Sequence, residues 1–160
     1  MIDQKHHCVH PAQRGAIVRL GRTLASGLIG SALVLTLATS PAAAADGVQR
    51  ASVVGGSGPG SQYCGLSDWN ATACFVPNGE WFWLKDEDAD GVPVAITWSY
   101  SNPGYPSRSG VIYNDHGKAA GWTNVNKSFA EDGQLYYSLC DFDVPTQQTS
   151  NCWGTAWAHT

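Results

Sequence analysis

Hydrophobic and polar residues alternate with a period of two through much of the chain after residue 62, which predicts β-strands. One face of the clearest run, residues 92–100, carries Val92, Val94, Ile96, Trp98 and Tyr100. Other strand candidates are residues 74–76, 80–85, 110–114, 134–142 and 152–158. No stretch sustains a helical period beyond a turn or two. The pattern therefore predicts an all-β domain, a small β-sandwich with a small barrel as the alternative.

The strand candidates 80–85 and 92–100 are separated by an acidic stretch that ends in Asp90-Gly91. This pair favours a tight hairpin turn between them. Pro93 has no backbone N–H and predicts a sheet edge at the start of the second strand. Trp81, Phe82 and Trp83 are consecutive, so they point to both faces of one strand. At least one of these large rings is expected outside the main core.

The N-terminal region has the three parts of an export signal. An apolar stretch, residues 24–38, is followed by small residues that end in Ala43-Ala44-Ala45. The basic residues that precede it are Lys5, Arg14, Arg19 and Arg22. This arrangement predicts a signal peptide over residues 1–45, cleavage before Asp46 and a secreted mature protein. The apolar stretch is short and contains Gly, Ser and Thr, which disfavours a retained membrane anchor.

The mature chain divides by composition into three parts. Residues 46–54 form a short extended segment, residues 55–61 have the composition of a flexible linker, and residues 62–160 form the β-rich domain. Such a linker is expected not to hold the segment against its own domain. The segment then either stays disordered or pairs with a sheet edge or groove of a larger secreted protein. The candidate partner-binding residues are Val48, Gln49, Arg50, Ala51, Ser52, Val53 and Val54.

Four cysteines remain after the signal is removed, and an even number in an exported chain predicts two disulfides. Three pairings exist. The sequence favours Cys64–Cys74 and Cys140–Cys152, because each pair is near in sequence and brackets turn-prone residues. Crossed pairings, which would tie the start of the domain to its end, are the alternative. The C-x-x-C spacing of a thiolate zinc site is absent.

The net charge of the whole chain is −4, and cleavage removes four cations and one anion. An acidic domain without a basic patch repels phosphate backbones, which disfavours nucleic-acid binding. No second apolar span follows the signal, so no membrane association is expected for the mature form.

Candidate catalytic groups are few. His116 lies in a turn-like stretch, His159 is next to the C-terminus, and no Gly-x-Ser-x-Gly motif is present. Glu80 and Glu131 leave a glycosidase-type carboxylate pair as an alternative. We expect no enzyme activity and no cofactor.

The spacing of Asp86, Asp88, Asp90 and Gly91 is that of the first half of a calcium-binding loop. The closing position is Thr97, which cannot supply a bidentate carboxylate. We expect no strong metal site, and the simpler interpretation is a charged hairpin tip.

A group of small secreted actinobacterial proteins of unassigned role is similar to this chain in Ala73-Cys74-Phe75, Gly79–Asp86, Asp90-Gly91 and Arg108-Ser109-Gly110. The overall plan resembles the small adaptor subunit of actinobacterial umbrella toxin particles. In that family a short extended segment inserts into a very large toxin polypeptide, and a disulfide-bonded β-sandwich links it to a lectin-bearing subunit. Only Val48–Val54 carries over, as the insertion strand. A weaker resemblance is to crystallin-like protease inhibitors.

These observations predict a secreted, non-enzymatic protein–protein interaction module, and the resemblance implies an adaptor in an antibacterial toxin complex. Two alternatives remain open. One is a protease inhibitor that uses residues 100–109, with Pro103 and Pro106, as a rigid loop. The other is a carbohydrate-binding module with Trp81 or Trp83 as its stacking platform.

Overall fold

The computed structural model describes residues 44–160. The predicted signal peptide, residues 1–45, lies outside the described residues except for its last two positions. The elements are β1 (Ala44–Arg50), β2 (Ser52–Val53), η1 (Ser61–Tyr63), β3 (Leu66–Ser67), β4 (Ala71–Val76), β5 (Trp81–Asp86), β6 (Val94–Ser101), β7 (Arg108–Asn114), η2 (Lys118–Ala120), β8 (Trp122–Asn126), β9 (Gln134–Asp143) and β10 (Gln148–His159). No helix within this range is long and apolar enough to cross a membrane.

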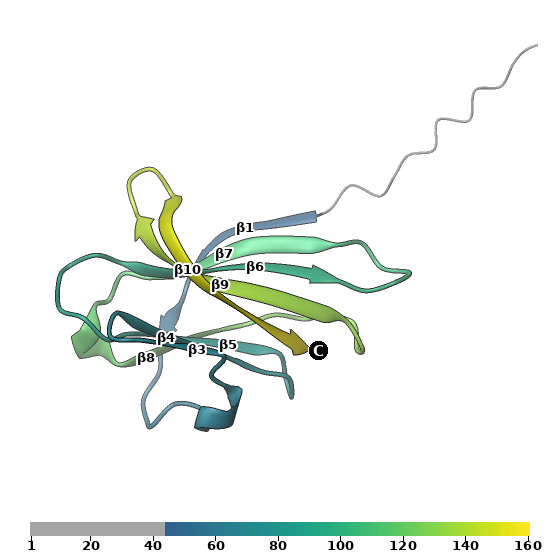
Figure 1. The fold of residues 1–160 in the computed structure, drawn as a ribbon, viewed down its shortest axis with the longest axis horizontal. Helices are drawn as coiled ribbons and strands as arrows, with labels where there is room; N and C mark the ends of the chain where they lie inside the picture. The colour runs from purple at the N-terminus through teal and green to yellow at the C-terminus, as the bar shows by residue number, and fades with distance from the viewer. Residues whose placement is uncertain (1–43) are drawn as a thin grey trace, which may run out of the picture. The chain divides into compact units, whose positions relative to one another are not determined.

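The strands form two five-stranded sheets that pack face to face as a β-sandwich, which confirms the predicted fold class (Figure 1). Sheet A has the order β1-β7-β6-β9-β10, and sheet B has the order β2-β8-β5-β4-β3. Figure 1 shows the two layers, with β1, β6, β7, β9 and β10 in one and β3, β4, β5 and β8 in the other. All neighbours are antiparallel except β1 and β7, which run parallel.

The period of two places the core as the sequence predicts. In β6, Val94, Ile96, Trp98 and Tyr100 are all buried. In β5, Phe82 is buried while Trp81 on the opposite face is exposed, so a large ring does lie outside the core. The Phe82 ring lies within 5.0–6.4 Å of four other aromatic rings, those of Phe75, Trp98, Phe129 and Tyr137. These rings come from both sheets, so their packing joins the two layers.

The predicted hairpin between residues 80–85 and 92–100 is wrong. β5 lies between β4 and β8 in sheet B, whereas β6 is the central strand of sheet A. Residues 87–93 therefore cross from one sheet to the other. The prediction that Pro93 marks a sheet edge is also wrong. Pro93 comes just before β6, so its missing N–H costs no hydrogen bond of the sheet. Its carbonyl accepts a hydrogen bond from the Phe142 N–H at 2.8 Å.

β8 is a strand that the alternation does not reveal. Its buried positions are Thr123 and Val125, and a buried threonine looks polar in the sequence. The Thr123 Oγ1 hydroxyl donates a hydrogen bond to the Leu84 carbonyl at 2.7 Å, which satisfies it inside the core. The burial of this strand therefore depends on a partner that is distant in sequence.

The two disulfides form within local hairpins, as predicted. Cys64 is bonded to Cys74, and Cys140 is bonded to Cys152 across β9 and β10. Two such bonds indicate an oxidising compartment.

β10 forms one edge of sheet A and is irregular. The β9–β10 register shifts between Ser150 and Trp153, and again between Trp153 and Ala156. Asn151 and Gly154 have positive φ angles of 47° and 62° at these shifts. Two parts of the strand pair without interruption, from Gln148 to Ser150 and from Ala156 to His159.

The position of Phe82 predicts the largest single-residue effect on stability. Phe82→Ala should lower the free energy of unfolding by about 3–5 kcal/mol, because it leaves a cavity between the two sheets. Trp81→Ala, on the outer face of the same strand, should lower it by less than about 1 kcal/mol. Urea denaturation of both variants checks this, and equal losses would contradict the assignment of Phe82 to the inter-sheet core.

Candidate partner-binding surfaces

Residues 44–53 supply the outermost strand of both sheets. The part of this segment that follows the predicted cleavage site, residues 46–53, is called the N-terminal edge. β1 pairs with β7 in the parallel register Val48↔Val111, and β2 pairs with β8 in the register Ser52↔Asn124. The chain changes sheet at Ala51, which is 2% exposed. The expectation that this segment stands apart from its own domain is therefore wrong.

An ion cluster holds β1 in place. The Asp46 carboxylate accepts hydrogen bonds from Arg108 Nε at 3.0 Å and Arg108 Nη2 at 2.7 Å, and from Lys127 Nζ at 3.2 Å. Lys127 Nζ also donates to Gln49 Oε1 at 2.9 Å and lies 5.1 Å from the Trp98 ring centroid. The Arg108 hydrogen bonds and the Lys127 charge lower the pKa of Asp46, against the opposing effect of its partial burial.

A second set of contacts holds the crossing between β1 and β2. Arg50 Nε donates to Asp115 Oδ1 at 2.6 Å. The nitrogens of His116 lie 3.4 Å from Arg50 Nη2 and 3.2 Å from the Ala51 carbonyl oxygen. These contacts match a neutral imidazole that accepts at Nδ1 and donates from Nε2. His116, considered from the sequence as a catalytic base, here fixes the N-terminal edge.

Most residues predicted to bind a partner are exposed on this edge. Val48, Gln49, Arg50, Ser52 and Val53 are exposed, Val54 is half-buried, and only Ala51 belongs to the core. Val48 and Val53 are 36% and 48% exposed, which is high for large apolar side chains. The outer edges of β1 and β2 pair with no other strand of the described chain. The residues thus form an exposed edge instead of a tethered peptide.

The middle of the segment predicted to be a flexible linker, residues 55–61, is packed on sheet B at Gly58. Gly58 lies against the Trp122 indole so closely that a Cβ atom there would collide with it. Val54 N–H donates to the Trp122 carbonyl at 2.9 Å, and η1 begins at Ser61. Composition alone indicates flexibility here, but Gly58 packs on the aromatic surface of Trp122, while Gly55 and Gly56 make no such contact.

The three aspartates of the calcium motif serve the local turn. Asp86, Asp88 and Asp90 accept backbone N–H bonds from Asp88, Ala89 and Val92, at 3.0, 2.7 and 2.9 Å. Burial raises the pKa of Asp86, which opposes the charged form that a cation needs. No group of three or more His, Cys, Asp or Glu side chains within residues 44–160 is placed to hold a metal ion.

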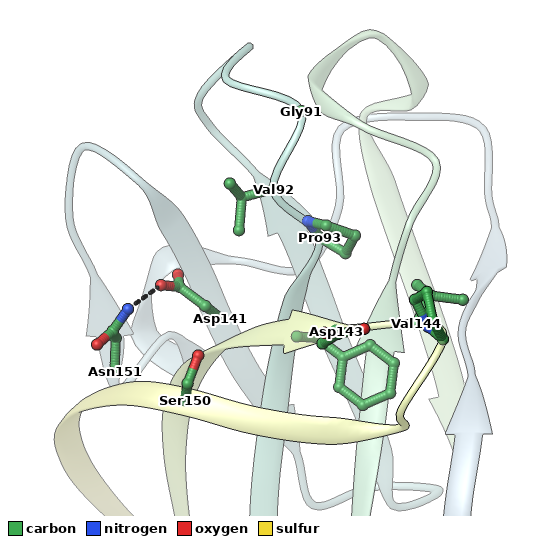
Figure 2. A pocket seen from close by; sticks show the side chains of 10 residues that line it. Gly91, Val92, Pro93, Asp141, Asp143, Val144, Ser150 and Asn151 are labelled. Atoms are coloured by element: carbon green, nitrogen blue, oxygen red, sulfur yellow. Dashed lines mark hydrogen bonds between the residues drawn. The ribbon is translucent and has the colours of Figure 1, made fainter. Parts of the chain in front are cut away.

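One hollow lies where the β5–β6 connection meets the β9–β10 hairpin (Figure 2). Figure 2 shows Asp141 bound to Asn151, whose Nδ2 donates to Asp141 Oδ2 at 2.8 Å, with Ser150 beside them and Pro93 across the hollow. The hollow is a shallow, open depression. Glu80, a sequence candidate for glycosidase chemistry, lies elsewhere and accepts the Phe129 N–H at 2.7 Å, which is a structural role.

The two aromatic candidates on β5 differ in accessibility. Trp81 is exposed, whereas Trp83 is half-buried and packs edge-on against Trp122, with 6.3 Å between ring centroids. The candidate inhibitory loop, residues 100–109, includes the ends of β6 and β7, and only residues 102–107 form the connection between them. In this connection Tyr105 is exposed, and Asn102 Nδ2 donates to the Glu131 carbonyl at 2.7 Å.

The sequence did not single out the residues that anchor the N-terminal edge. Asp46 meets Arg108 and Lys127 across 62 and 81 residues, and no local pattern relates such distant charges. Tyr136 and Trp157 were also missed as a surface pair. The alternation within residues 134–142 and 152–158 does place both on an outer face, but the sequence does not show that their strands are adjacent.

The ion cluster predicts a pH-dependent contribution to stability. Asp46→Asn should lower the free energy of unfolding at neutral pH by about 1.5–3 kcal/mol, because Lys127, 7% exposed, loses a charged partner. The pKa of Asp46 is lowered in the fold, so this contribution is complete above about pH 4 and is lost as the pH falls through the lowered pKa. Urea denaturation across pH 2–7 checks the prediction. The exposed Asp132→Asn serves as the control, and a pH-independent difference would contradict it.

Comparison with known proteins adds no relative: no protein-family model, curated protein or solved structure matches this chain.

Proposed function

We propose that this chain is a secreted, non-enzymatic interaction module that binds a larger secreted protein through its N-terminal edge. The observation that carries the proposal is that one short segment forms the outermost strand of both sheets and exposes Val48 and Val53 there. Unpaired strand edges bind extended segments of other proteins by adding a strand. Sheet edges are often protected by shortening, charge or bulges, and here β2 is short and β1 has a register shift between Ala45 and Val48, so the proposed docking stretch is the regular part of β1, residues 48–50, with Val53 beyond it.

The attachment of the edge also supports this role. Asp46, Arg108 and Lys127 fix β1, and Arg50, Asp115 and His116 fix the crossing to β2. An edge that is rigid before binding loses little conformational entropy when a partner docks. We therefore propose binding on the outer side of the segment, with β1 kept in its own sheet. This differs from the insertion expected from the umbrella-toxin resemblance.

The resemblance supplies the proposed partner class. A toxin-particle adaptor of this plan would connect a large secreted polypeptide to a second subunit, so two separate binding surfaces are needed. The N-terminal edge is proposed as the surface for the large polypeptide. The disulfides and the predicted signal peptide are consistent with a protein that works outside the cell.

Point variants test the edge better than deletion, because deletion would remove Ala51 from the core. The variant Val48→Lys/Val53→Lys should reduce recovery of the large secreted partner from culture supernatant at least tenfold, since both side chains are exposed and lysine blocks strand addition. Its thermal midpoint should stay close to that of the wild type.

The matched control is Val144→Lys, a valine with the same 36% exposure as Val48 but located on the β9–β10 hairpin. It should recover the partner as the wild type does. Equal recovery by the double variant and the wild type would rule out the N-terminal edge as the docking surface.

A further inference from the structure

A second exposed surface lies at the opposite edge of sheet A from β1. Tyr136 on β9 and Trp157 on β10 are direct cross-strand partners, and they are 46% and 68% exposed. Their neighbours Leu135, Tyr137 and Ala156 are buried, so the two rings stand on the outer face of the sheet. Large aromatic rings kept in water beside one another are typical of a binding surface.

The two rings border a small pocket of about 310 Å³, lined by Gln134, Tyr136, Trp157, Ala158 and His159. The His159 ring packs edge-on against Trp157, with 5.4 Å between ring centroids, which limits rotation of the indole. Gln134 is the cross-strand partner of His159. The Gln134 amide and the His159 imidazole, which can both donate and accept hydrogen bonds, therefore form the next cross-strand pair on the same face as Tyr136 and Trp157.

The side chains that surround the pair on sheet A are mostly hydroxyl groups, and a carboxylate, that of Asp132, lines the neighbouring hollow beside Ser101 and Gln134. Pairing places Tyr136 beside Ser99 on β6, and Ser99 beside Ser109 on β7. Ser101 is the partner of Gln134, and the hydroxyls of Ser138 and Thr155 lie 3.1 Å apart. Thr97 on β6 also faces outward, and its partners on the neighbouring strands are Val111 and Ser138. A face of mostly hydroxyl groups on an acidic protein favours a neutral ligand that is rich in hydrogen-bonding groups.

We propose that this face is a saccharide-binding site for an uncharged polysaccharide. The apolar C–H face of a pyranose ring stacks on an aromatic ring, and its hydroxyls hydrogen-bond to amide, imidazole and hydroxyl groups. Neighbouring strands are about 4.8 Å apart, which is close to the length of one sugar unit. A glycan that crosses the strands thus places successive units over Trp157, Tyr136 and the serines of β6 and β7. The site rests on Trp157 and Tyr136 at the far edge of sheet A and does not need the N-terminal edge, although Val48 lies on the same outer face, in the row of Thr97 and Ser138.

The site differs from the aromatic platform expected on β5. Trp83 is held against Trp122, and Gly58 covers Trp122, so that part of sheet B is packed by the protein itself. Trp81 is exposed without a second ring beside it on the neighbouring strand, where its partner is Asn126. Tyr136 and Trp157 are adjacent and both accessible, which a stacking platform requires.

Affinity electrophoresis of the mature protein in gels that contain barley β-glucan, arabinoxylan, galactomannan or glycol chitin tests the proposal. At least one of these neutral polysaccharides should retard the wild type, and polygalacturonate, which is anionic, should not. Trp157→Ala and Tyr136→Ala should each weaken the retardation at least tenfold, and Trp157→Phe should retain part of it. Thermal melts of these variants should match the wild type, because both side chains are exposed.

Trp69→Ala and Trp81→Ala are the matched controls, since both remove exposed tryptophans from sheet B or its turns. Both should bind within twofold of the wild type. The proposal is overturned if no neutral polysaccharide retards the wild type, if polygalacturonate retards it equally, or if Trp157→Ala binds as well as Trp69→Ala. Because Val48→Lys/Val53→Lys should leave the retardation unchanged, failure of this site is distinguishable from failure of the N-terminal edge.

Discussion

The structure depends on one short segment being shared between two sheets. β1 closes sheet A, β2 closes sheet B, and Ala51 passes through the border of the core between them. Because Asp46 and Arg50 anchor the two ends of β1 to distant charges, the segment is part of the sandwich and not an appendage. Its inner side contributes to stability, while its outer side remains available. The same residues can therefore serve the fold and a partner.

The sequence predicts the local features well and the long-range ones poorly. Alternation in residues 92–100 identifies β6, and the spacing of Cys140 and Cys152 around a turn identifies their disulfide. The Asp90-Gly91 pair indicates a hairpin that does not form, because a turn signal fixes the bend but not which strand comes next to it. The glycine-rich residues 55–61 look uniformly flexible in the sequence, which does not show that Gly58 packs on Trp122, more than 60 residues away.

The two proposed surfaces could be predicted only in part. Residues 48–54 were singled out from the sequence, but their parallel pairing with β7 depends on Arg108 and Lys127, which are far away in the chain. Tyr136 and Trp157 lie in predicted strands, yet their pairing follows from the register of the β9–β10 hairpin. In both cases the missing information is strand adjacency, which charge and periodicity do not encode.

The irregular edge of β10 has a consequence for the protein at high concentration. Two register shifts and the left-handed residues Asn151 and Gly154 divide its outer rim into short pieces. A second copy of the chain can align only a few consecutive backbone groups along such a rim, which is too few to extend the sheet from molecule to molecule. At high concentration the protein should therefore resist fibril growth through β10, even though Trp157 near the end of this strand is exposed.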